Sequence, residues 1–153
     1  MCSIKIGLLR VDEDQSKLPA DLIAAYKSTL FQVYCGDEVI TLKVGEKGEN
    51  LRGLFEKHSV NFACYITAYN PYGRMLSKQE NEARNERLKT ELVSRYPIYE
   101  GVGLDPNGEW EGEASFLALG ITKNIAEVLA TGFEQNAVVI VDSDLNVSLL
   151  FTK

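Results

Sequence analysis

Apolar residues recur along this 153-residue chain in short runs, separated by polar turns and by longer polar segments with helical spacing. Short apolar runs of about 4–8 residues are typical of strands, and apolar residues three and four positions apart are typical of amphipathic helices. The pattern predicts strands at 4–9, 29–34, 38–44, 62–68, 98–104, 114–119, 137–141 and 147–151, and helices at 21–27, 50–57, 77–95 and 122–130.

The order of the predicted elements from residue 21 onward is α-β-β-α-β-α-β-β-α-β-β. This order favours an α+β fold with helices packed on a single mixed, largely antiparallel sheet. A chain of this length is expected to form one domain, and no repeat, linker or low-complexity tract divides it. We therefore interpret residues 1–153 as a single domain with an N-terminal extension at 1–20.

The predicted helix at 77–95 has an unusual inward face. Its start matches a capping box, in which Ser77 and Glu80 each bond a backbone N–H of the first turn. Leu88 and Leu92 define the apolar face of the second half of the helix.

Asn81 and Arg84 project onto that same face in the first half of the helix. Buried polar groups need partners, because each unpaired one costs roughly 1–3 kcal/mol. Two interpretations stay open. In the first, Asn81 bonds the Asn70–Pro71 turn and Glu80 forms an ordinary i,i+4 ion pair with Arg84. In the second, the polar face of the helix contacts a ligand.

Topology predicts where these polar residues meet. The strand at 62–68, the long helix and the strand at 98–104 form a β-α-β unit, so the two strands should run parallel, with 114–119 antiparallel to them. The strand at 137–141 should then run parallel to 114–119. One edge of the sheet would gather Thr67, Asn70, Glu80, Asn81, Arg84, Trp110, Glu111, Glu113, Ser115, Gln135 and Asn136.

Strand ends beside a helix start are the usual ligand sites of such sheets, and a helix N-terminus attracts anions. Arg84 would hold a phosphate or carboxylate. The neutral ligand-binding residues would be Thr67, Asn70, Asn81, Ser115, Gln135 and Asn136.

Glu113, with Glu80 or Glu111, is the candidate general acid or base, because two close carboxylates raise one pKa. Ser115 has no nearby His to activate it as a nucleophile. The leading hypothesis is therefore a protein that binds or acts on a small anionic, nucleotide- or metabolite-like molecule, and the residues do not decide whether it is an enzyme.

A second hypothesis is a non-catalytic interaction or inhibitor module that binds another protein. Aromatic side chains are enriched in protein interfaces. Such a patch would comprise Tyr69, Tyr72, Tyr96, Tyr99 and Trp110. A third hypothesis, RNA binding, is disfavoured because the net charge is −6 and the isoelectric point is near 4.9.

Cysteine and histidine usage excludes several classes of site. The three cysteines (Cys2, Cys35, Cys64) lack metal-binding spacing, and His58 is the single histidine. Classical zinc sites and His-based triads are therefore not expected, and we predict no metal and no cofactor. No apolar run approaches the ~18 residues of a membrane span, and the N-terminus does not resemble a signal peptide. These features predict a cytoplasmic protein.

Five motifs follow one another from Ile66 onward: Ile66-Thr-Ala-Tyr-Asn-Pro, Glu80-Asn-Glu-Ala-Arg, Gly101-Val-Gly-Leu-Asp-Pro-x-Gly-x-Trp, Glu113-x-Ser and Phe133-x-Gln-Asn-Ala. In this order they resemble the bacterial domain-of-unknown-function family numbered 3293, over about 29–151. The resemblance implies a small cytosolic α+β protein and no assigned activity. It also implies signature polar residues at Thr67, Asn70, Glu80, Asn81, Arg84, Glu113, Ser115, Gln135 and Asn136. Tyr69 departs from the family pattern, since many members have Trp there.

Overall fold

The computed structural model describes residues 18–152. The strand expected at 4–9, most of the loop before residue 19 and Cys2 lie outside the described residues. The elements are α1 (Ala20–Ser28), β1 (Leu30–Cys35), β2 (Glu38–Leu42), the 3-10 turn η1 (Glu49–Leu51), α2 (Arg52–His58), β3 (Ala63–Ile66), the 3-10 turn η2 (Pro71–Gly73), α3 (Lys78–Val93), β4 (Ile98–Leu104), β5 (Glu113–Leu119), α4 (Lys123–Gly132), β6 (Ala137–Val141) and β7 (Val147–Phe151).

One seven-stranded sheet joins all the strands, in the order β2-β1-β4-β5-β3-β6-β7, and every neighbouring pair is antiparallel. The predicted α+β class and the predicted order of elements are confirmed. The predicted strand directions also agree with the structure. Strand β4 runs the same way as β3 with β5 between them, and β6 runs the same way as β5 with β3 between them.

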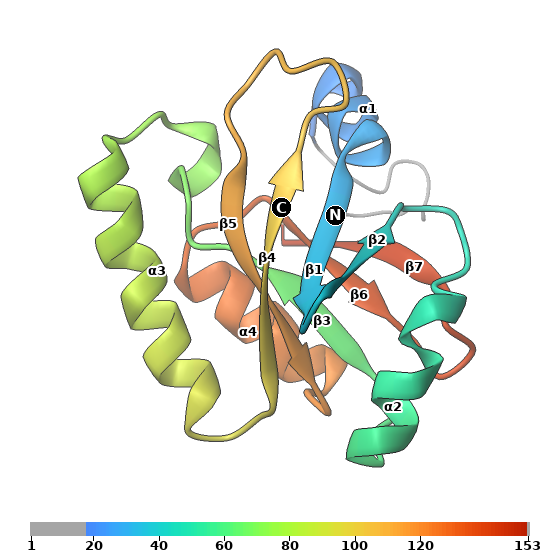
Figure 1. Ribbon diagram of the computed structural model, residues 1–153. Coiled ribbons are helices and arrows are strands. Elements are labelled where there is room, and N and C mark those ends of the chain that lie inside the picture. The colour runs from blue at the N-terminus through green and yellow to red at the C-terminus, as the bar shows by residue number, and fades with distance from the viewer. Residues whose placement is uncertain (1–17, 153) are drawn as a thin grey trace.

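The sheet is strongly curled, so that β1, β2 and β4 lie in front of β6 and β7 in the view of Figure 1. The loop after β2 bonds the start of β7 and joins the two edges of the sheet at one end. Gly45 N–H donates to the Val147 carbonyl at 2.9 Å, and Gly48 N–H donates to the Leu145 carbonyl at 2.7 Å. The curl therefore closes at this end, where the loop after β2 pairs with the β6–β7 turn and with the first residue of β7.

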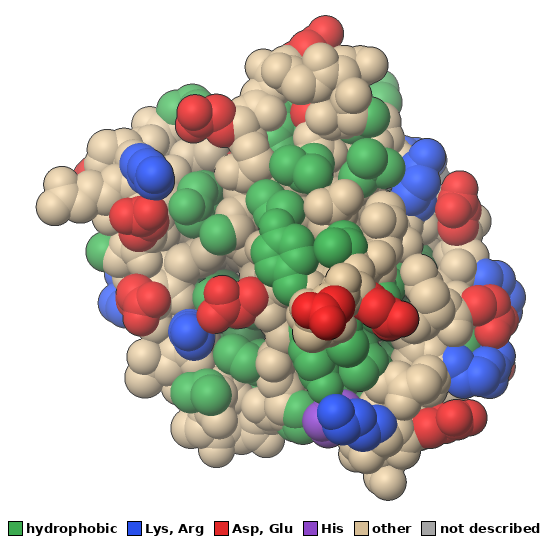
Figure 2. Space-filling view, viewed as in Figure 1, with side chains coloured by type: hydrophobic (Ala, Val, Ile, Leu, Met, Phe, Trp, Pro, Cys, Tyr) green, Lys and Arg blue, Asp and Glu red, His purple; other side chains and the backbone are tan. Residues whose placement is uncertain are grey.

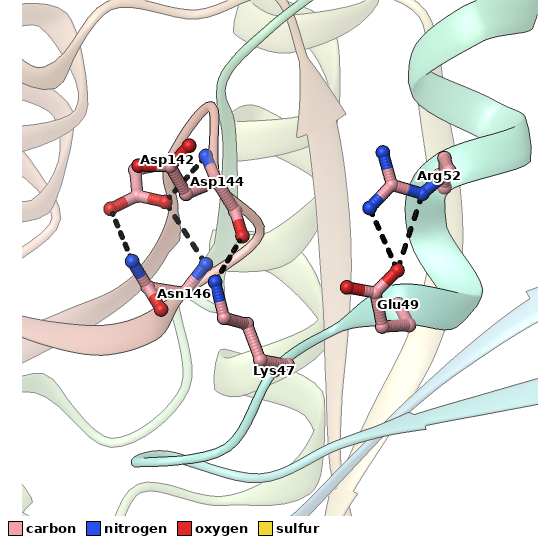
Figure 3. Close-up of polar contacts among 6 residues, drawn as sticks. All are labelled: Lys47, Glu49, Arg52, Asp142, Asp144 and Asn146. Carbon is pink, nitrogen blue, oxygen red and sulfur yellow. Dashed lines mark hydrogen bonds and ion pairs between the residues drawn. The ribbon is translucent and has the colours of Figure 1, made fainter.

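Side chains reinforce this closure, as Figure 3 shows. The Asp142 carboxylate accepts from the backbone N–H groups of Asp144 and Asn146, at 2.9 Å each, and so shapes the β6–β7 turn. Lys47 Nζ then donates to the Asp144 carbonyl at 2.8 Å, across the closed edge. The nearby Arg52–Glu49 pair is exposed and bridges the start of α2 to η1. The turn is thus fixed by its own carboxylate and tied to the opposite strand.

The two faces of the sheet carry two separate cores. The concave face encloses Phe31, Val33, Leu117 and Val141 with side chains of α2, while the convex face of β5, β3 and β6 packs against α3 and α4. Strand β3 is buried on both faces, which explains its nearly continuous apolar sequence. No helix within residues 18–152 covers the convex face of β1, β2 and β4, and apolar side chains are visible there in Figure 2.

Gly101 allows the sharpest part of the curl. A Cβ atom at this position would lie 1.9 Å from the Gln32 carbonyl oxygen of the neighbouring strand β1 and 3.2 Å from the Tyr65 hydroxyl. Real Cβ atoms do not approach backbone so closely, so only glycine permits β1 to lie this close to its neighbour β4. Glycine at 101 is therefore a requirement of the curled architecture.

We expect Gly101→Ala to lower the free energy of unfolding by ~2–3 kcal/mol or more, because β1 must move away from β4 to admit the methyl group. Gly53→Ala in α2 is the matched control, since a Cβ there meets nothing within 4 Å. That control should leave stability unchanged or raise it by about 0.5–1 kcal/mol. Urea unfolding of both variants checks this, and equal midpoints would contradict the proposed close approach.

Candidate functional site

The candidate site lies at the end of the curled sheet opposite the closed edge. The segment 67–76 leaves β3 there, the loop 105–112 joins β4 to β5, and α1 lies beside that loop (Figure 1). Ligand sites in curled and barrel-like sheets are commonly found at such open ends. The structure brings most of the predicted site residues to this end.

The backbone of 67–76 is irregular and partly strained. Asn70 has φ +47° and Tyr72 has φ +51°, in the left-handed region that non-glycine residues seldom occupy. Glu134, in the adjacent turn after α4, has φ +59°, and its carbonyl accepts from Tyr72 N–H at 2.6 Å. Strain of this kind persists only where the surroundings fix it, and here α3 does so.

Asn81 and Asn70 are joined by two hydrogen bonds. The Asn81 side-chain oxygen accepts from Asn70 backbone N–H at 2.8 Å, and its amide donates to Asn70 Oδ1 at 2.9 Å. Asn70 Oδ1 also accepts from Leu76 N–H at 3.0 Å. The interpretation in which Asn81 bonds the Asn70–Pro71 turn therefore agrees with the structure.

Arg84 and Asn85 hold the backbone at the end of β3. Arg84 Nε donates to the Ala68 carbonyl at 2.7 Å, and its Nη2 donates to the Phe133 carbonyl. Asn85 accepts from Ala68 N–H and donates to the Ala114 carbonyl, at 2.8 Å in each case. Arg84 faces Glu134, 3.6 Å away, and not Glu80. The polar face of α3 is thus explained by backbone groups that need partners.

The remaining neutral residues have similar roles. Thr67 Oγ1 donates to the Ala114 carbonyl at 2.7 Å, and Gln135 Nε2 donates to the Tyr69 carbonyl at 3.0 Å. Asn136 is buried, and its carbonyl accepts from Thr152 N–H at 3.0 Å. Ser115 is buried and donates to the Glu113 carbonyl at 2.9 Å. Direct ligand contacts by these residues stay a prediction.

Glu80 does not join this cluster. Its carboxylate accepts from Ser77 N–H at 3.1 Å, while Glu80 N–H donates to Ser77 Oγ, so the predicted capping box is formed. These bonds lower the pKa of the exposed Glu80 carboxyl. The structure therefore assigns Glu80 to the helix cap, and Glu113 is left as the carboxyl group of the predicted catalytic pair that lies in the cluster.

Glu113 is the first residue of β5 and is mostly buried on the concave side of the sheet. Its Oε2 accepts from Asn70 Nδ2 at 3.1 Å, and among the described residues the other carboxylate oxygen, Oε1, has no hydrogen-bond donor. Burial raises the pKa of Glu113, and the bond from Asn70 offsets part of that effect. Glu113 thus combines burial of its carboxylate with a carboxylate oxygen that can accept a further hydrogen bond.

The charge of this carboxylate acts on three tyrosines. Burial and then the charge of Glu113 raise the pKa of Tyr26 on α1. Burial also raises the pKa of Tyr65 on β3, which donates to the Gln32 carbonyl at 2.9 Å and lies near Ser115. For Tyr69 burial is the largest cause, followed by the charges of Glu82, Glu113 and Glu111. The open end therefore combines a carboxylate with phenol groups.

Tyr26, Tyr65 and Asn85 were missing from the predicted site. Asn85 carried a usable signal, because it projects beside Leu92 on the inward face of α3. Tyr26 and Tyr65 appeared only as apolar positions of a helix and of a buried strand. The charge of Glu113 acts on both hydroxyl groups, a relation that the spacing of residues does not reveal.

The predicted aromatic patch is divided. Tyr72 and Trp110 are exposed at the open end, but Tyr99 is near the other end, where its hydroxyl lies 2.8 Å from His58 Nε2. Tyr96, which follows α3, packs against the convex core. Within residues 18–152 no group of three or more His, Cys, Asp or Glu is arranged to hold a metal ion. No helix in that range is long and apolar enough to cross a membrane.

We expect Arg84→Ala to lower the free energy of unfolding by ~2–4 kcal/mol, because the Ala68 carbonyl loses its donor and the Phe133 carbonyl keeps only the bond from Gln135. Arg95→Ala, at an exposed position after the same helix, is the control and should stay within about 0.5 kcal/mol of wild type. Chemical denaturation measures both. Equal stability of the two variants would show that Arg84 does not support the fold.

The raised pKa of Glu113 predicts a pH dependence of stability. A carboxyl whose pKa is higher in the folded state stabilises the fold most when protonated, and this contribution is lost as the pH rises through the folded-state pKa. Glu113→Gln mimics the neutral form, so its stability relative to wild type should increase from about pH 4 to about pH 8. Urea midpoints at both values test this, with the exposed Glu109→Gln as control. A pH-independent difference would contradict the burial of Glu113.

Comparison with known proteins agrees with the resemblance found in the sequence. A family model described as "Protein of unknown function (DUF3293)" matches residues 66–138. No curated protein and no solved structure matches the chain. The matched range is shorter than the expected 29–151, and it runs from the end of β3 to the start of β6, with α3, β5 and the bonded polar residues between them. Over residues 66–138, this chain is similar to the DUF3293 family of proteins of unknown function.

Proposed function

We propose that the open end of the curled sheet binds a small molecule, and that Glu113 is the residue that contacts it directly. The other polar residues at this end, Asn81, Arg84 and Asn85 among them, bond the protein's own backbone. Of the two predicted catalytic carboxylates, Glu113 is the mostly buried one, and its Oε1 has no donor among the described residues. In this proposal the other residues support the site and Glu113 forms its centre.

The observation that carries the proposal is a mostly buried carboxylate whose charge opposes folding. Burial raises the pKa of Glu113, so ionisation destabilises the folded chain. The neutral residue Gln would avoid that effect at this position. Residues that destabilise the folded state are typical of functional sites, because such residues are kept there for activity and not for stability.

The geometry also bears on the ligand and the chemistry. An anionic ligand, as expected from Arg84, would have to displace the guanidinium from two carbonyls and compete with Glu134. A carboxyl group with a raised pKa exchanges protons closer to neutral pH, so Glu113 is suited to general acid–base chemistry on a bound molecule. We propose that this occurs in the bacterial cytoplasm.

A thermal-shift screen tests the proposal with wild type, Glu113→Gln and the exposed-site control Glu109→Gln. The compounds are amino acids, amines, nucleotides and sugar phosphates. A ligand at a hundredfold excess over its Kd stabilises by about 2.7 kcal/mol, or ~5–10 °C in a chain of this size. We expect at least one compound to shift wild type and Glu109→Gln and to lose its effect in Glu113→Gln.

Shifts that persist unchanged in Glu113→Gln would contradict the proposal, as would a screen in which no compound shifts the wild type. If nucleotides or sugar phosphates raise the melting temperature, the hypothesis of an anionic ligand would be supported instead. Since Glu113→Gln changes the intrinsic melting temperature, the ligand-induced shift is compared within each variant.

A second candidate, a protein-interaction module, is favoured by the uncovered face of β1, β2 and β4. Tyr34 and Val39 pair across β1 and β2 and are 46% and 54% exposed. The half-buried Leu30 pairs with Leu104 on the same face. Figure 2 shows apolar groups across this front surface. If this face binds a protein partner and the open end binds no small molecule, the screen should find no ligand whose binding depends on Glu113.

A further inference from the structure

We propose that the ligand of the open end carries a protonated amine, with Glu113 as its counter-ion. This inference rests on the proposed function and specifies its ligand class. It differs from the anionic ligand that the sequence suggested, and it follows from the groups that the fold places around Glu113.

The open end is rich in hydrogen-bond acceptors. An ammonium group has three N–H donors and no acceptor. Glu113 offers the carboxylate oxygen that Asn70 does not bond, and the phenol oxygens of Tyr26 and Tyr69 lie in reach of its charge. Tyr65, whose hydroxyl already donates to the Gln32 carbonyl, closes the inner side. These groups match an ammonium better than a phosphate, which requires donors.

The charges at this end have one sign. Three carboxylates act on the Tyr69 hydroxyl, those of Glu82 on α3, Glu111 in the β4–β5 loop and Glu113 on β5. The guanidinium of Arg84 is turned to carbonyl groups and to Glu134, and no cation contributes to the electrostatics of Glu113 in the described part of the chain. A buried carboxylate without a cationic partner is costly, and a ligand ammonium would supply that partner.

The chain as a whole is also negatively charged, with a net charge of −6. A surface with negative charge raises the local concentration of cations. Aromatic rings next to a carboxylate also favour cations through the negative faces of the rings. Charge, acceptors and aromatic surroundings therefore point to one ligand class.

The test compares n-butylamine with n-butanol, which share a chain and differ in the charged group. Backbone amide NMR shifts of wild type are titrated with each compound at about pH 8, where the amine is still protonated. We expect butylamine to shift amides around Glu113 and Tyr69 in a saturable manner and butanol to bind at least about tenfold more weakly.

Variants and pH locate the interaction. Glu113→Gln should weaken butylamine binding about tenfold or more, while the exposed-site control Glu109→Gln should leave it unchanged. Tyr69→Phe removes one acceptor, keeps the ring and should weaken binding less. Butylamine affinity should also fall from about pH 8 to about pH 5, because Glu113, which is bonded by Asn70 and whose charge acts on Tyr26, Tyr65 and Tyr69, takes up a proton.

The outcomes separate this inference from the proposed function. If Glu113→Gln abolishes binding of a neutral or anionic compound while butylamine never binds, the site stands and the amine class is overturned. Equal affinity of wild type for butylamine and butanol also overturns the amine class. If Glu113→Gln changes the binding of no compound, both proposals fail.

Discussion

The backbone between Thr67 and Leu76 leaves the sheet without continuing as a regular strand or helix, so its polar groups need partners from elsewhere. Side chains of α3 supply them: Asn85 pairs with Ala68, Arg84 with the Ala68 carbonyl, and Asn81 with Asn70. These bonds hold two non-glycine residues in the left-handed region. They also fix the Asn70 amide that bonds Glu113, so the geometry of the site depends on them.

The curl of the sheet is the second constraint on the site. Its edges meet through the loop after β2 and the start of β7, and Gly101 lets β1 cross close to β4. The closed end is sealed by backbone bonds and apolar packing, while the opposite end holds Glu113 and its tyrosines. Tyr65 and Glu113 share one face of the neighbouring strands β3 and β5, and Tyr26 reaches the same end from α1. Architecture, and not any local motif, assembles this group.

Structural and functional polar residues can be distinguished here by what their atoms contact. Asn81, Arg84 and Asn85 satisfy backbone groups, so their removal is expected to affect folding first. Glu113 opposes folding when ionised and retains an oxygen for another partner. Polar residues on the inward face of a helix are therefore weak evidence of a ligand until their partners are known.

The sequence alone determined the α+β class, the order of elements and the strand directions, because these follow from local periodicity, turn residues and the rules of chain connection. It also gathered Asn70, Asn81, Glu113 and Gln135 at one end of the sheet. Periodicity reports which face a side chain occupies, but not the atoms that it meets. Only the tertiary structure decided that Arg84 bonds carbonyls and that Tyr26 and Tyr65 approach Glu113, because such contacts depend on the curl of the sheet and on hydrogen bonds between segments distant in sequence.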